Sequence, residues 1–337
     1  MTGWINLTDE QRKATIDQAE QISGIGAKAI EKDWWVTFIL KSLFHSILAP
    51  YMVFKGGTSL SKCWKLIERF SEDVDIALAP EAFDMEYSEC PSKSYVERLK
   101  KKGCKFTSNE LKRELEKQVA VLGMPDGIIT IAAAPMLQKF PDTDPQILYV
   151  KYRSLYEANL YVADEVKIEV SVRSLLSPYT NSPIQSLLNE INPNTVYGES
   201  PFLIKVVEPR KTFLEKIFLL HEEFGKPDKA KIRAERMSRH LYDLVNIMQT
   251  DYAKEALDDT MLYNQLLQHR KYYSHISWVD YKSMDHATLS FIPPEEVLEI
   301  YRMDYQTMQE QMIYGESIPF DSLIEQLKLL QKKFRMK

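Results

Sequence analysis

The sequence predicts a mixed α/β domain followed by a helical domain, and three observations lead to that prediction. Short β-rich runs recur in the first two thirds of the chain, residues after Pro209 are spaced almost entirely as helices, and a Gly-Gly pair separates a strand from a helix. With 337 residues, 45% of them hydrophobic, the chain is long enough for two packed domains. We place an α+β (α/β) domain, a mixed sheet flanked by helices, at 1–205 and the helical domain at 206–337.

Two helices are predicted first, and a strand–turn–helix unit follows them. Apolar residues recur at helical spacing over 8–22 and 30–48. The run Tyr51–Phe54 predicts a strand that ends at Gly56-Gly57. Helical spacing resumes after this turn and predicts one helix that includes Leu60, Trp64 and Ile67.

A second strand is predicted at Val74–Leu78. Side chains alternate across a strand, so Asp73 and Asp75 are expected on one side as neighbours. A helix at 107–122 is expected to begin at a capping box of Thr107 with Glu110. The further predicted elements are strands at 147–152 and 166–172 and C-terminal helices at 211–224, 234–249, 256–270, 295–312 and 320–335.

Composition excludes several classes of protein. The formal net charge of -5 is not that of a polycation that coats nucleic acid. The three cysteines form no CxxC pair, which argues against a zinc site and a disulfide framework. The longest apolar stretch, 34–54, is interrupted by Lys41, His45 and Pro50, and the N-terminus lacks an export signal, so we expect no membrane segment and a cytoplasmic location.

The residues that indicate chemistry lie between Lys55 and Asp75. Glycines at a strand-to-helix turn allow the backbone to approach phosphate oxygens, and Thr58 and Ser59 add hydroxyl donors. Two aspartates one residue apart, Asp73 and Asp75, are suited to holding divalent ions against a triphosphate. Gly-Gly-Thr and Asp-x-Asp are each weak signals alone, but together, in strand–turn–helix–strand order, they indicate nucleotidyl transfer.

A third carboxylate is expected because a two-metal site needs more ligands. Glu169 lies in the middle of a predicted strand among apolar neighbours, where an acid requires a partner or a metal. We therefore predict Mg²⁺ as the cofactor, bound as two ions in a two-metal site with Asp73, Asp75 and Glu169 as ligands.

At this point the sequence resembles the AbiEii/AbiGii-type nucleotidyltransferases, toxins of bacterial abortive-infection and toxin–antitoxin systems, in the DNA polymerase β-like superfamily. The resemblance extends over nearly the whole chain. The interval between Gly57 and Asp73 is longer than in compact nucleotidyltransferases, and we interpret it as a longer helix. The matching pieces are Ile30–Val36, Phe54–Leu60, Arg69–Asp75, Thr212–Ile217, Arg239–Leu244, Asp304-Tyr305 and Met312–Gly315.

The resemblance implies a division of roles along the chain. Asp73 and Asp75 would be metal ligands and Gly56, Gly57 and Thr58 the phosphate-binding turn, while the helical domain would contribute Lys216 and Asp243 to the active site. It also implies that Lys32 or Asp33 supports the site. Our predicted nucleotide-binding residues are Gly56, Gly57, Thr58, Ser59, Lys62, Ser71, Lys216, Arg239 and His240, and the predicted catalytic residues are Asp73, Asp75, Glu169, Lys216 and Asp243.

Residue types alone leave the helical-domain assignments open. Helical spacing places Arg236, Arg239, His240 and Asp243 on one polar stripe. The alternatives are a solvated face with an Arg239–Asp243 pair, a Lys216 side chain that extends to water, and a structural role for His240.

The predicted function is transfer of a nucleoside monophosphate from a nucleoside triphosphate, and the resemblance implies that the acceptor is RNA, such as the 3′ end of tRNA, or a protein hydroxyl. The toxin resemblance implies a cognate antitoxin. Between Lys205 and Arg239, ten Lys or Arg and six Asp or Glu leave an excess of positive charge, which is either a binding surface for a phosphate-rich acceptor or ordinary protein surface. The alternatives are a nucleotidyltransferase acting on a small molecule and a catalytically inactive module that binds nucleotides or a partner.

Overall fold

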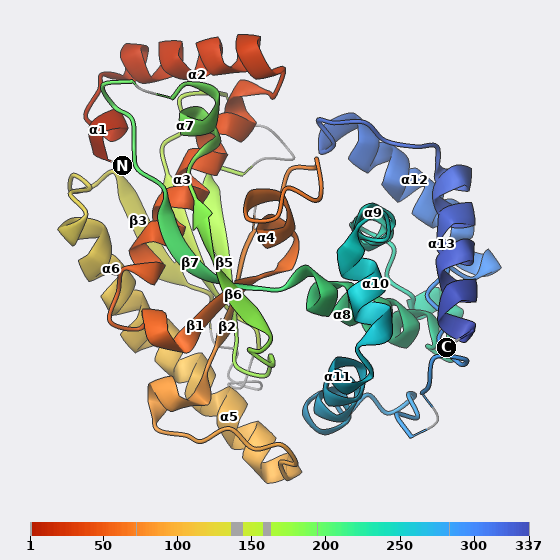
Figure 1. Cartoon of the computed structure of the whole chain (residues 1–337). Helices are drawn as coiled ribbons and strands as arrows, with labels where there is room; N and C mark the ends of the chain where they lie inside the picture. Colours follow the sequence, from red (N-terminus) through yellow and green to blue (C-terminus); the bar gives the residue numbers. More distant parts are fainter. Residues whose placement is uncertain are drawn as a thin grey trace. The chain divides into compact units, whose positions relative to one another are not determined.

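The chain divides into two compact units in the computed structural model, which describes residues 2–71, 73–135, 144–157, 163–193, 195–282 and 284–336 (Figure 1). The sheet unit comprises Met1–Cys63, Phe70–Ser88 and Lys93–Val207. The helical unit comprises Glu208–Lys337 together with two short segments from earlier in the chain, Trp64–Arg69 and Glu89–Ser92.

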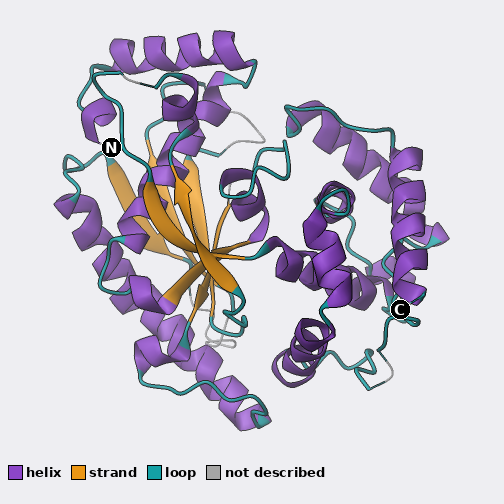
Figure 2. Ribbon diagram, in the orientation of Figure 1, coloured by secondary structure: helices purple, strands orange, loops and turns teal. Residues whose placement is uncertain are grey.

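The sheet unit is built on one seven-stranded mixed sheet, in the order β3-β4-β5-β2-β1-β7-β6. The pairs β1–β7 and β2–β5 are parallel and the other neighbours are antiparallel, so the predicted mixed sheet is confirmed (Figure 2). The strands are Met52–Lys55 (β1), Asp73–Leu78 (β2), Ile129–Ala133 (β3), Gln146–Tyr152 (β4), Glu165–Ser171 (β5), Tyr179–Ile184 (β6) and Phe202–Val207 (β7).

Helix α3, Ala27–Phe44, is the most buried helix of the sheet unit. It contacts β2, β5 and α6, and both Trp34 and Trp35 on it are almost fully buried. The preceding helix, α2, begins at a capping box in which the Thr8 and Gln11 side chains bond to each other's backbone N–H groups. The helices of the sheet unit are Thr2–Ile5 (α1), Asp9–Ser23 (α2), Ala27–Phe44 (α3), Gly56–Lys62 (α4), Lys93–Phe106 (α5), Lys112–Val121 (α6) and Leu187–Ile191 (α7).

The helix predicted at 107–122 begins earlier than expected, and its capping box is wrong. Helix α5 runs into a π-helical stretch, Thr107–Leu111, that leads directly into α6. Phe106, which precedes Thr107, already has helical dihedral angles (φ -60°, ψ -48°), so no helix begins at Thr107 and Thr107 is not an N-cap. Thr107 is fully buried within this continuous helix.

The helix after the glycine turn is shorter than predicted. Helix α4 ends at Lys62, and residues 64–69 belong to the helical unit. We interpreted the long interval between Gly57 and Asp73 as a longer helix, and that interpretation is wrong. The Trp64 ring lies beside the Tyr252 ring, and Ile67 is almost fully buried, so both are apolar positions of the helical unit although neither lies on a helix.

The helical unit contains the predicted C-terminal helices with two changes. Helix α9 begins at Ser238 rather than 234, and the stretch predicted as one helix at 256–270 is two helices separated by Asp259, which caps the second by accepting from Leu262 N at 2.9 Å. In the part of the chain that the structure describes, no helix combines the length and the apolar character needed to cross a membrane. The helices are Pro209–Phe224 (α8), Ser238–Ile247 (α9), Asp251–Asp258 (α10), Thr260–Tyr273 (α11), Glu295–Gln311 (α12) and Phe320–Arg335 (α13).

Candidate functional site

Strand β2 presents two carboxylates on one face of the sheet. Val74 and Ile76 are fully buried, whereas Asp73 and Asp75, which alternate with them, are half-buried. The prediction that the two aspartates are neighbours on one side of a strand is therefore confirmed. Glu72, between this pair and Ser71, lies outside the described residues.

The neighbouring strand β5 adds an acid and a base to the same face. In the parallel register, Glu169 is opposite Asp75 and Lys167 is opposite Asp73. The Glu169 carboxylate forms an ion pair with Lys167. Burial acts to lower the pKa of Lys167, but its hydrogen bond to Glu169 and the charge of Asp73 outweigh that effect and raise the pKa. The face thus combines three carboxylates with a lysine that remains charged.

The carboxylates of this face do not form a closed metal cage as the side chains stand. Among the described residues, no group of three His, Cys, Asp or Glu side chains is arranged to hold a metal ion. Asp73 and Asp75 have the oxygen donors that Mg²⁺ prefers. Glu169 is engaged by Lys167, so its role as a third ligand stays a prediction.

Gly56 fits against Asp75 in a way that no other residue could. Its φ is +80°, in the left-handed region that favours glycine. A Cβ placed on Gly56 would lie 2.0 Å from Asp75 Oδ2 and 2.7 Å from Asp75 Cγ. The glycine turn at the end of β1 therefore makes room for the Asp75 side chain of β2.

The hydroxyls predicted to bind phosphate are bonded within the protein. Thr58 Oγ1 lies 2.8 Å from Ser71 Oγ and also donates to the carbonyl of Asp73. Ser59 is fully buried and donates to Gly56 O at 2.8 Å. These contacts join α4 to the start of β2. The assignment of Gly56, Gly57, Thr58, Ser59 and Ser71 to nucleotide binding stays a prediction.

Lys62 has protein partners of its own. Its ammonium lies 2.6 Å from Asp33 Oδ1 and 3.1 Å from Gln185 O, and its side chain is 4% exposed. This places Lys62 in an ion pair at the C-terminal end of α4, while its predicted contact with a triphosphate stays a prediction.

The helical unit contains a buried ionic cluster centred on Asp243. Arg69 donates to both carboxylate oxygens, from Nε to Oδ1 at 2.7 Å and from one terminal nitrogen to Oδ2 at 2.8 Å, and Lys216 Nζ lies 2.8 Å from Oδ2. Asp243 is fully buried. Burial by itself raises the pKa of Asp243, but the charges of Arg69 and Lys216 reverse this and hold the pKa well below its usual range. The alternative of a solvated helix face at Asp243 is therefore wrong.

Arg69 is the member of this cluster for which no role was predicted from the sequence. Arg69 forms an isolated β-bridge with Ile313, and the adjacent Glu68 carbonyl accepts from Tyr314 N at 3.0 Å and Gly315 N at 3.3 Å. Two separate matching pieces of the family resemblance, Arg69–Asp75 and Met312–Gly315, thus meet at Arg69. The signal in the sequence that could have identified Arg69 was its position, as a charged residue, within the matching piece Arg69–Asp75.

Arg236 is not part of the predicted polar stripe. It precedes α9, with φ +57°, and its N–H donates to Asp304 Oδ1 at 2.6 Å. The other oxygen of Asp304 accepts from Ser238 N at 2.9 Å, so a carboxylate on α12 caps the start of α9.

His240 contacts Lys216 beside this cluster. Lys216 Nζ lies 3.2 Å from His240 Nδ1, a contact that suits a neutral imidazole whose Nδ1 accepts. Burial and the charges of Lys216 and Arg239 hold the pKa of His240 well below its ordinary value. Burial likewise lowers the pKa of Lys216, against the attraction of Asp243. Nucleotide binding by Lys216, Arg239 and His240 stays a prediction.

We expect His240 to make the protein sensitive to mild acid. Below about pH 6.5, an unfolded histidine takes up a proton that folded His240 does not, so the free energy of unfolding falls by at most ~1.4 kcal/mol per pH unit. Urea denaturation between pH 7 and pH 5 should show a smaller decrease for His240→Gln than for the wild type. His221, whose pKa burial also lowers, remains in both proteins. Equal acid sensitivity of the two proteins would contradict this assignment.

Most of the positively charged side chains counted between Lys205 and Arg239 are buried or form ion pairs within the helical unit. Lys211 and Lys216 are buried, and Arg210 is paired with Glu208 and Asp259. Further pairs in this stretch are Lys226 and Arg233 with Glu223, and Lys231 with Asp228. The count of charges therefore overstates the open basic surface there.

A family model and a solved structure match this chain. Residues 39–326 match the family model described as "Nucleotidyl transferase AbiEii toxin, Type IV TA system". No curated protein matches the sequence. Among solved structures, MenT4, a nucleotidyltransferase toxin from Mycobacterium tuberculosis H37Rv, is similar at 15% identity and a TM-score of 0.48, with 98% of this chain and 99% of that chain covered. Because the family model spans most of the chain, the protein belongs to the AbiEii family of nucleotidyltransferase toxins of type IV toxin–antitoxin systems.

Proposed function

We propose that the protein transfers a nucleoside monophosphate from a nucleoside triphosphate to a hydroxyl of an RNA acceptor. The observation that carries the proposal is the pair of carboxylates, Asp73 and Asp75, on one face of β2, with Gly56 shaped around the second of them. Family membership supplies the reaction class, and this face supplies the acidic residues that the reaction needs.

The chemistry follows from the charges on that face. Mg²⁺ bound at Asp73 and Asp75 would supply a Lewis acid that neutralises the triphosphate. The acceptor oxygen attacks the α-phosphorus, a carboxylate of the β2 pair takes the hydroxyl proton, and the bond from the α-phosphorus to its bridging oxygen breaks, so pyrophosphate leaves with the electron pair. Lys167 keeps Glu169 neutralised when no cation is bound, because the two side chains form an ion pair.

The acceptor is proposed to be RNA because the sheet unit carries an exposed basic ridge. Arg98, Lys101, Lys102 and Lys105 are exposed on α5 at positions that share one helix face, while Val96 and Leu99 are buried. A stripe of cations on a protein of net charge -5 is suited to a phosphate backbone. A protein hydroxyl, a small molecule and an inactive binding module are the competing outcomes. The toxin family also implies a cognate antitoxin, whose co-expression should restore growth.

The reaction is tested by incubating the protein with each α-labelled nucleoside triphosphate, Mg²⁺ and total RNA. The wild type should label RNA, and Asp73→Asn/Asp75→Asn should not. Asp126→Asn, an exposed carboxylate in a loop, is the matched control and should label RNA normally. If a protein or a small molecule were labelled instead, that molecule and not RNA would be the acceptor. If no acceptor were labelled, the result would contradict the proposal that the protein is an active transferase.

The basic ridge has its own test, which needs no catalysis. Replacing Arg98, Lys101, Lys102 and Lys105 by Gln should weaken RNA binding and reduce the slope of log K against log salt by up to about 3.6, since each phosphate contact contributes about 0.7 to 0.9. Filter binding at several salt concentrations measures this slope. Replacing four exposed cations of α13, Lys328, Lys332, Lys333 and Arg335, is the control. Equal effects of the two quadruple variants would exclude a specific role for α5.

A further inference from the structure

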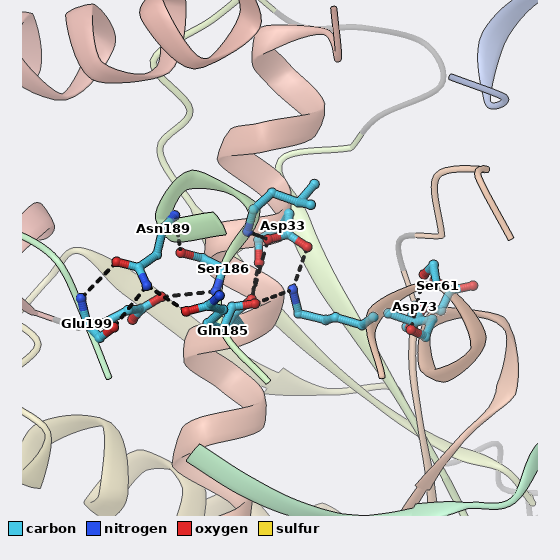
Figure 3. Close-up of polar contacts among 11 residues, drawn as sticks. Asp33, Ser61, Asp73, Gln185, Ser186, Asn189 and Glu199 are labelled. Atoms are coloured by element: carbon cyan, nitrogen blue, oxygen red, sulfur yellow. Dashed lines mark hydrogen bonds and ion pairs between the residues drawn. The ribbon is translucent and has the colours of Figure 1, made fainter. Parts of the chain in front are cut away.

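Lys62 and Asp33 form an ion pair that fixes one end of α4. The pair is largely shielded, since the two side chains are 4% and 11% exposed, and its N–O distance is 2.6 Å. Lys62 also donates to Gln185 O at 3.1 Å, so its ammonium has two protein acceptors. Asp33 lies on α3, Lys62 ends α4 and Gln185 lies in the loop after β6, so three segments far apart in the sequence meet here (Figure 3).

The surroundings of Asp33 are fixed independently of Lys62. Its second oxygen, Oδ2, accepts from Leu187 N at 2.6 Å at the start of α7. Ser186 caps α7 by accepting from Asn189 N at 3.2 Å, and its own N–H donates to Glu199 Oε1 at 3.1 Å. Figure 3 shows this network around Asp33, with Ser61 and Asp73 on the other side of the view. Asp33 is therefore a rigid anchor rather than a mobile surface acid.

The other end of α4 contacts the carboxylate strand. Gly56 lies against the Asp75 side chain, and the Thr58 hydroxyl bonds to Ser71 and to the Asp73 carbonyl. Helix α4 is only seven residues long, about 10 Å at 1.5 Å per residue, so a shift at Lys62 is transmitted to Gly56. The position of the glycine turn relative to Asp73 and Asp75 thus depends on anchors at both ends of the helix.

We propose that the Asp33–Lys62 pair is a positioning device that keeps the glycine turn of α4 in register with Asp73 and Asp75, and that Lys62 does not bind the triphosphate. This rests on the proposed nucleotidyl transfer. To bind a triphosphate, the Lys62 ammonium would have to leave the shielded Asp33 carboxylate. Asp33 would then remain buried without its cation. An open phosphate site would instead present an ammonium with no such partner.

The test is a double-mutant cycle of Lys62→Met and Asp33→Asn. Each single variant should lower kcat by about tenfold or more, as expected for a misplaced site, while KM for the nucleoside triphosphate changes less than about threefold. The double variant should recover part of the lost kcat, because neither charge is left unpaired. Lys28→Met breaks another ion pair of α3, to Asp164 at 2.8 Å, and should leave kcat unchanged.

The opposite kinetic pattern would overturn the proposal. If Lys62 binds phosphate, Lys62→Met raises KM about tenfold or more, Asp33→Asn leaves KM unchanged or lowers it, and the double variant shows no recovery. Amide hydrogen exchange without nucleotide separates this idea from the proposed reaction. The backbone amides of residues 56–62 should exchange faster in either single variant and regain protection in the double variant. Unchanged exchange in both single variants would contradict the positioning role, whatever reaction the protein catalyses.

Discussion

Replacement of Gly56 by alanine is expected to lower the rate of nucleotidyl transfer by about 100-fold or more, because a displacement of about 1 Å at a reacting group costs that much. The added Cβ would lie 2.0 Å from Asp75 Oδ2, closer than any real contact, so the Asp75 side chain or the glycine turn must move. The φ of +80° also disfavours alanine at this position. Steady-state transfer of labelled nucleotide measures the loss.

Gly24→Ala is the matched control for this variant. Gly24 has a similar φ, +72°, at the C-cap of α2, but nothing lies within 4 Å of an added Cβ. It therefore shares the conformational cost of a left-handed alanine, roughly 1 kcal/mol, without the collision. Normal transfer by Gly24→Ala together with loss in Gly56→Ala would assign the effect to Asp75, whereas equal losses would point to backbone strain alone.

The elements around the carboxylates could be predicted from the sequence because their signals are local. Strand β2 alternates apolar residues with Asp73 and Asp75, and the turn before α4 contains two glycines. Strand β6 was missed since it includes Pro183 and four of its six residues are exposed, which leaves no apolar alternation to detect. The end of α4 was missed because Trp64 and Ile67 keep helical spacing while packing in the other unit.

The ionic cluster of the helical unit could not be predicted in full, because its partners are distant in the sequence. Arg69 and Asp243 are 174 residues apart, and no local pattern reports which buried cation meets which acid. Residue spacing alone suggested Arg239 as one possible partner of Asp243, since the two are four residues apart on one predicted helix. Tertiary packing instead brings in Arg69 from a segment that joins the helical unit out of chain order.

Removal of the Asp243 carboxylate is expected to destabilise the helical unit more than any other single change in this cluster. Asp243→Ala leaves two buried cations, Arg69 and Lys216, without their carboxylate, and breaking a buried pair in this way typically costs about 3–5 kcal/mol. Arg69→Met should cost less, because Lys216 still neutralises Asp243. Urea denaturation at pH 7 gives the free energies of unfolding, with Glu325→Ala, which breaks an exposed pair with Lys328, as a control expected to change by less than about 1 kcal/mol.

The lowered pKa of Asp243 also predicts how the destabilisation caused by Asp243→Ala should change with pH. Because the pKa of folded Asp243 lies well below that of an unfolded aspartate, its contribution to stability is present above about pH 4 and is lost as the pH falls toward the folded pKa. The difference in unfolding free energy between wild type and Asp243→Ala should therefore narrow in acid. A difference that stays constant down to about pH 3 would mean that lost packing, rather than the charge of Asp243, accounts for the destabilisation.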